Sequence, residues 1–86
     1  MEITEIHRGH LKIAVQERTA TLSGEGFLHN ARAHNPAHVD YVLYRETLTH
    51  WDSPWEKEIV PADVQAAILA FVKADFERRG QVLAIE

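Results

Sequence analysis

Residues 60–79, VPADVQAAILAFVKADFERR, form the longest stretch with helical periodicity in the chain and decide the fold. Apolar side chains recur there at the spacing of one broad helix face. Pro61 suits the first helical turn, and Gly80 suits the left-handed position just after the last turn. The predicted apolar face comprises Val64, Ile68, Leu69, Phe71, Val72 and Phe76. An isolated helix of this length is marginally stable in water, so the face predicts a sheet beneath it.

Asp75 is the exception on this face, because it lies among the apolar side chains. Arg79 follows four residues later, so an ion pair at a helix end that overhangs the sheet is the favoured interpretation. A buried or partner-facing carboxylate is the alternative.

Alternating apolar residues predict short strands on both sides of the helix. Two-residue turns at 8–9 and 17–18 separate the first three strands, and Gly24 to Gly26 ends or bulges the third. A polar, histidine-rich loop is expected at 29–38. Apolar side chains occur at both odd and even positions of residues 39–44. This predicts a central strand that is covered on both faces. The expected strands are residues 2–7, 10–16, 19–23, 39–44, 48–51 and 82–85.

Strands first and a helix later predict an α+β fold, with residues 1–86 as a single domain. We expect a mainly antiparallel sheet of four to six short strands, with one long C-terminal helix packed on one face and a last strand after it. Whether that last strand pairs parallel or antiparallel is left open by the sequence.

Composition restricts the function classes. The formal net charge is −4, which argues against a general electrostatic footprint on nucleic acid. It suits a basic protein partner, although a mildly acidic charge is also ordinary for a soluble protein. The chain has no cysteine, which fits a reducing cytoplasm. No stretch approaches 18 apolar residues, and the first ten residues do not resemble a secretory signal. We therefore expect a cytoplasmic protein with no membrane partner and no direct nucleic-acid partner.

No motif for catalysis, a cofactor or a metal stands out. The spacings of the six histidines match no zinc signature, so His7, His10 and the loop histidines are expected to be solvated. Ser23 and Ser53 lie in no nucleophile elbow. The residues therefore predict no catalytic site, no cofactor and no metal. A metal-binding domain that uses the loop at 29–38 stays as an alternative.

The two tryptophans differ in their surroundings. Trp51 follows a strand-like segment and is expected to be structural, filling the gap between the sheet and the start of the helix. Trp55 lies in a turn-rich loop, DSPWEK, where Asp52, Glu56 and Glu58 surround it with negative charge. An aromatic anchor with an acidic rim suggests a partner-binding site. A loop tryptophan that folds back on the helix is the alternative.

Five segments in this order resemble the small bacterial immunity proteins of the immunity protein 74 family. The resemblance covers most of the chain and is carried by EITEIHRGHLKI, YVLY, LTHWDSPWE, the helix and VLAIE. It implies an α+β protein with a characteristic tryptophan, for which Trp51 is the matching position. It also implies a protein encoded beside a polymorphic toxin, which it neutralises by binding rather than by catalysis.

The partner would then be the C-terminal domain of the cognate toxin, with a basic cleft if that toxin is a nuclease. The binding candidates Asp52, Trp55, Glu56 and Glu58 follow from their exposure and chemistry and not from the family pattern. A self-associating accessory module, such as a homodimer joined at the strand edge 81–86, is the other class left open.

Overall fold

Helix α1 runs over Ala62–Arg78 in the computed structural model, which describes residues 1–26 and 39–86. Pro61 lies at the N-cap with extended backbone, one position before the first turn. At the other end Gly80 has a φ of +73°, and the amide of Gln81 donates a hydrogen bond of 2.9 Å to the carbonyl of Phe76. This is the glycine-terminated helix end that the sequence predicts.

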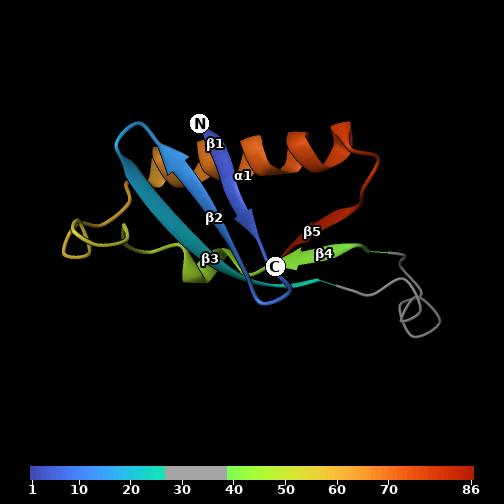
Figure 1. The fold of residues 1–86 in the computed structure, drawn as a ribbon, viewed down its shortest axis with the longest axis horizontal. Helices are drawn as coiled ribbons and strands as arrows, with labels where there is room; N and C mark the ends of the chain where they lie inside the picture. Colours follow the sequence, from blue (N-terminus) through green and yellow to red (C-terminus); the bar gives the residue numbers. More distant parts are fainter. Residues whose placement is uncertain (27–38) are drawn as a thin grey trace.

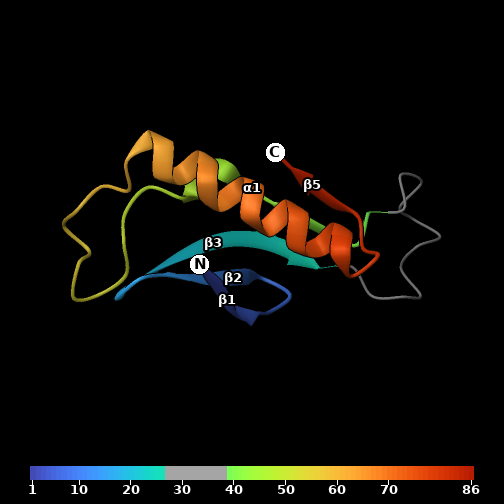
Figure 2. The ribbon, with the colours of Figure 1, turned by 90° about the horizontal axis from the view of Figure 1, so that it is seen from above.

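The described strands form a five-stranded sheet in the order β1-β2-β3-β4-β5, and α1 lies along one face of it (Figures 1 and 2). All neighbouring strands are antiparallel except β4 and β5, which are parallel. A parallel neighbour needs a long crossover, and α1 provides it. The strands are β1 (Glu2–Ile6), β2 (His10–Val15), β3 (Arg18–Gly26), β4 (Tyr41–Leu43) and β5 (Leu83–Ile85), with the 3-10 helix η2 (Arg45–Thr47) after β4. The predicted α+β class is confirmed, and the direction of the last strand is settled as parallel.

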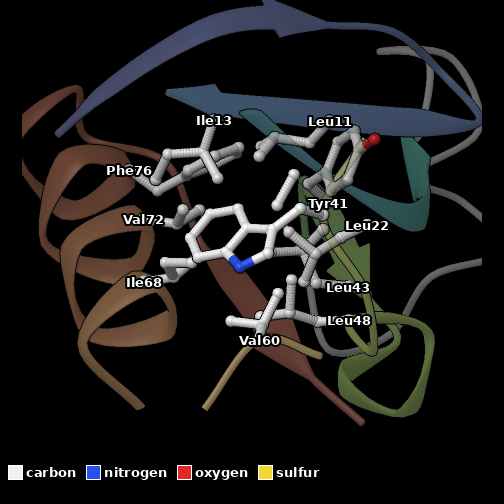
Figure 3. Close-up of a cluster of buried hydrophobic side chains, with 12 residues drawn as sticks. Leu11, Ile13, Leu22, Tyr41, Leu43, Leu48, Val60, Ile68, Val72 and Phe76 are labelled. Carbon is white, nitrogen blue, oxygen red and sulfur yellow. The ribbon is translucent and has the colours of Figure 1, made fainter. Parts of the chain in front are cut away.

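The hydrophobic core lies between α1 and the sheet (Figure 3). Ile68, Val72 and Phe76 of α1 are at most 2% exposed, whereas Val64, Leu69 and Phe71 are half-buried around them. Burying such side chains contributes roughly 1.5–3 kcal/mol each before entropy is counted. From the sheet the core takes Leu11, Ile13, Ala20, Leu22, Tyr41 and Leu43. All three residues of β4 are buried, in agreement with the predicted central strand.

Asp75 forms the predicted ion pair with Arg79, at 2.9 Å, and also contacts Arg78. The carboxylate does not overhang the sheet, however, because Asp75 is only 8% exposed. The prediction that the helix end overhangs the sheet is therefore wrong at Asp75, and the alternative of a buried carboxylate holds. Two arginines compensate a buried charge there instead.

The β1–β2 and β2–β3 hairpins refine the predicted turns. The register of β1 shifts between Ile3 and Glu5, which explains why the apolar residues Ile3 and Ile6 are three apart. The second turn comprises Gln16 and Glu17 rather than residues 17–18, because Arg18 already pairs with Val15. The predicted position of this turn is therefore wrong by one residue.

The strand predicted at 48–51 is wrong. This segment has only an isolated bridge between His50 and Ile59, and η2 precedes it. Leu48 is 2% exposed and Trp51 is 6% exposed, so both enter the core three positions apart. A regular strand would point these two side chains to opposite faces. The segment therefore places two side chains in the core that a regular strand could not bury on one face.

The strand β3 extends through Gly26, so the two glycines end it without breaking it. Gly24 is needed because a β-carbon there would meet the ring of Tyr41. The predicted loop at 29–38, with Phe27 and Leu28 before it, lies outside the described residues. Within the part of the chain that is described, no helix is long and apolar enough to cross a membrane.

A candidate partner-binding surface

Residues 52–59, here called the tryptophan loop, project from one end of the molecule (Figures 1 and 2). The base of the loop is closed by backbone contacts. The amide of Trp51 donates to the carbonyl of Glu58 at 3.2 Å, and the amide of Val60 donates to the carbonyl of Thr49 at 2.9 Å. The loop is therefore held at both ends, as in a hairpin.

Asp52 fastens the loop to the sheet. Its amide donates to the carbonyl of Thr19 at 2.8 Å. Its carboxylate accepts hydrogen bonds from the hydroxyl of Thr19 at 3.0 Å and from the hydroxyl of Thr21 at 2.9 and 3.0 Å. The carboxylate is thus engaged within the protein, and Asp52 positions the loop.

Trp55 and Glu58 meet at Arg18. The guanidinium carbon of Arg18 lies 4.4 Å from the ring centroid of Trp55 and 5.8 Å from that of Trp51. Its Nη1 lies 3.0 Å from Oε1 of Glu58. A guanidinium within about 6 Å of an aromatic ring is attracted to the face of that ring. Arg18 therefore ties the half-buried Trp55 and the exposed Glu58 to the start of β3.

A hollow of about 400 Å³ opens beside the loop. Trp51, Val64 and Ile59 give it apolar walls, and Glu17 and Glu58 lie on its lining with Arg18. Ile59 is 67% exposed, which is high for a large apolar side chain. Glu56 is exposed on the same loop. The surface thus combines aromatic and aliphatic groups with an acidic edge.

The sequence candidates therefore have distinct settings. Glu56 faces solvent, Glu58 holds Arg18, Trp55 stacks against Arg18, and Asp52 contacts β3. Trp51, predicted to be structural, is 6% exposed in the core cluster with Ile68, and the half-buried Phe71 packs against that cluster. The role of the four loop residues in binding stays a prediction.

The sequence analysis did not predict that Glu17, Arg18 and Ile59 belong to this surface. Arg18 lies 40 positions from Glu58, and no local pattern connects the two. Ile59 breaks no alternation and carries no charge. The feature that marks Ile59 is its exposure, which the sequence does not show.

A second group of polar side chains lies on the β1–β2 hairpin. Ligand atoms of Glu5, His7 and His10 all lie within 4.8 Å of one another. The hydrogen bond from His10, followed by the electrostatic attraction of His7 and Lys12, lowers the pKa of Glu5 from its ordinary value of 4.5. Among the described residues this is the group that could hold a metal ion.

The architecture is that of a small α+β protein, in which the tryptophan loop and the hollow beside it bring aromatic, aliphatic and acidic side chains together. Residues 3–86 match the immunity protein 74 family, and the chain belongs to that family. No curated protein and no solved structure matches the chain. The family implies an immunity protein, that is, an inhibitor of a toxin.

Proposed function

We propose that this protein neutralises the C-terminal domain of a cognate bacterial toxin by covering its active site with the tryptophan loop. The observation that carries the proposal is the cluster of Trp55, Arg18 and Glu58 beside an exposed Ile59. Tryptophan and arginine are the side chains that most often dominate binding energy at protein interfaces. Their presence on one surface supports a protein partner.

The loop is organised before binding. Contacts at its base and the hydrogen bonds of Asp52 to Thr19 and Thr21 restrict its backbone. A surface that is already ordered loses less conformational entropy on association. The roles we assign are therefore anchor for Trp55, positioning for Asp52, and contact with the partner for Glu56 and Glu58.

The charge of the protein favours a basic partner. The formal net charge is −4, and Glu17, Glu56 and Glu58 lie around the hollow and the loop. If the toxin is a nuclease, its substrate cleft is positively charged, and carboxylates take the places of phosphates there. Such complementarity accelerates association most strongly at low salt.

The biological setting that we propose is the cytoplasm of a bacterium that carries a polymorphic toxin system. A chain without cysteine suits a reducing compartment. The proposed mechanism requires no cofactor and no catalytic step from this protein, because inhibition results from occupying the cleft.

The direct test is a titration of the protein against the C-terminal domain of the toxin encoded beside its gene. We expect nanomolar affinity and loss of toxicity. Without any binding, the proposed function fails, and sedimentation of the protein alone would then test the homodimer.

Matched charge reversals locate the surface. Glu56→Lys should slow association about tenfold at low salt, because repulsion replaces steering of a basic partner. Glu77→Lys makes the same charge change at an exposed position of α1 and should leave the rate near that of the wild type. Trp55→Ala should speed dissociation about tenfold or more. If Glu56→Lys and Trp55→Ala both bind like the wild type while remaining folded, the tryptophan loop is not the interface.

A further inference from the structure

The β1–β2 hairpin brings three metal-binding side chains to one face of the sheet. Ile6 pairs with Leu11, so His7 and His10 lie opposite each other at the tip of the hairpin. Glu5 precedes His7 by two residues and therefore points to the same face. The juxtaposition follows from the strand pairing and does not depend on a flexible loop.

The distances from the Glu5 carboxylate to the two histidines are close to those between ligands of a tetrahedral metal centre, and all three ligand atoms lie within 4.8 Å of one another. Nε2 of His10 lies 3.1 Å from Oε2 of Glu5, and Nε2 of His7 lies 3.5 Å from the same oxygen. Ligands bonded to Zn²⁺ at 2.0–2.1 Å lie about 3.3 Å apart in a tetrahedron. The two imidazole rings are stacked with centroids 4.6 Å apart, and the Nε2 atom of each lies near the same Glu5 oxygen.

The backbone beneath the three side chains is held by the rest of the fold. The amide of His7 donates to the carbonyl of His10 at 2.8 Å, and the hydroxyl of Tyr41 donates to the carbonyl of His7 at 2.6 Å. The amide of Gly26 donates to the carbonyl of Arg8 at 2.8 Å. A site on a fixed backbone needs little rearrangement to bind an ion.

We propose that Glu5, His7 and His10 bind a zinc ion. Two imidazole nitrogens and one carboxylate oxygen are a characteristic donor set for Zn²⁺ with three protein ligands. The fourth position is open to water or to a side chain of a bound protein, since the ligands are partly exposed. This departs from the expectation of solvated histidines, because the sequence spacing does not reveal which face each side chain occupies.

The site is separate from the tryptophan loop. The hairpin tip contacts the end of β3 through Gly24 and Gly26, whereas the loop contacts the beginning of β3 through Thr19. Figures 1 and 2 show the β1–β2 turn and the tryptophan loop in different parts of the molecule. Zinc binding therefore goes beyond the proposed function and can be tested with the protein alone.

The experiment is a calorimetric titration of the metal-free protein with ZnCl₂, together with NMR detection of the histidine imidazoles. We expect one zinc ion per chain and shifts of the Nε2 resonances of His7 and His10. Glu5→Gln, His7→Gln and His10→Gln should each weaken zinc binding at least tenfold. Because these side chains are partly exposed, the variants should remain folded. The NMR measurement on the wild type tests the site without any substitution.

Two control variants assign the ion to the hairpin. His50→Gln changes an exposed histidine at the base of the tryptophan loop and should leave zinc affinity unchanged. Replacement of His29, His34 and His38 together should also leave it unchanged. The proposal is overturned if the wild type binds no zinc at 100 micromolar, about a tenfold excess over a usual protein concentration. It is equally overturned if binding survives His10→Gln and disappears with the loop replacement.

Discussion

Replacing Asp52 with alanine should destabilise the protein far more than its position in a surface loop suggests. The carboxylate accepts hydrogen bonds from the hydroxyls of Thr19 and Thr21, all at 2.9–3.0 Å in a half-buried setting. The Asp52→Ala variant removes the shared acceptor and leaves both hydroxyls to find water. The loop would also lose the side-chain connection of Asp52 to β3 and would keep that of Glu58 to Arg18.

The magnitude follows from two hydrogen bonds to a charged group. Such bonds contribute roughly 1.5–3 kcal/mol each when they are buried, and partial rehydration reduces the loss. We expect the free energy of unfolding to fall by about 2 kcal/mol for Asp52→Ala. For a domain of 60–100 residues this lowers Tm by roughly 8–16 °C.

Urea denaturation of the wild type and four variants measures the effect and its origin. Asp52→Ala and Thr21→Val are compared with the double variant, and a coupling of about 1 kcal/mol is expected because the two side chains share a hydrogen bond. Glu56→Ala, at an exposed position of the same loop, serves as the control and should change stability by less than about 0.5 kcal/mol. A stability loss in Asp52→Ala no larger than that of Glu56→Ala would refute the anchoring role.

Two further predictions concern Tyr41 and its neighbour Gly24. Burial raises the pKa of Tyr41 above its ordinary value of 10.0, so the unfolded chain loses this proton first and stability falls as the pH rises above 10. Urea denaturation at pH 9 and pH 11 should show a smaller fall for Tyr41→Phe, and equal falls would contradict the assignment. Gly24→Ala should lower the free energy of unfolding by about 1–3 kcal/mol. The added β-carbon would meet the Tyr41 ring and lie 2.7 Å from the carbonyl oxygen of Val42. Gly9→Ala, where nothing lies within 4 Å of the added β-carbon, should be nearly neutral, and urea denaturation of both variants tests the difference.

The α+β class was predictable because its signals are local. The apolar face of α1 repeats within a few turns, and Gly80 marks the helix end by its own conformational freedom. Likewise, the alternation of Leu11 and Ile13 with polar neighbours identifies β2 without knowledge of its partners. Each of these features depends on residues that are close together in the chain.

The candidate site was predictable only as a loop. The residues DSPWEK indicate turns, an aromatic side chain and negative charge, and the structure has all three in the tryptophan loop. Their roles were not readable, because Asp52 contacts Thr19 and Thr21 on another element and Glu58 contacts Arg18 across 40 positions. Nothing in the local sequence distinguishes an anchored carboxylate from a free one.

By itself, then, the sequence determined the helix, most of the strands and the acidic character of the protein, because periodicity, turn chemistry and charge belong to short segments. Only the tertiary structure decided that β5 pairs parallel with β4. It also decided that Leu48 and Trp51 both enter the core from a segment that is not a strand. It also placed His7 and His10 around one carboxylate. Strand pairing and core packing decide such contacts, because they determine which side chains share one face. These side chains are distant in sequence or lie on opposite sides of a turn.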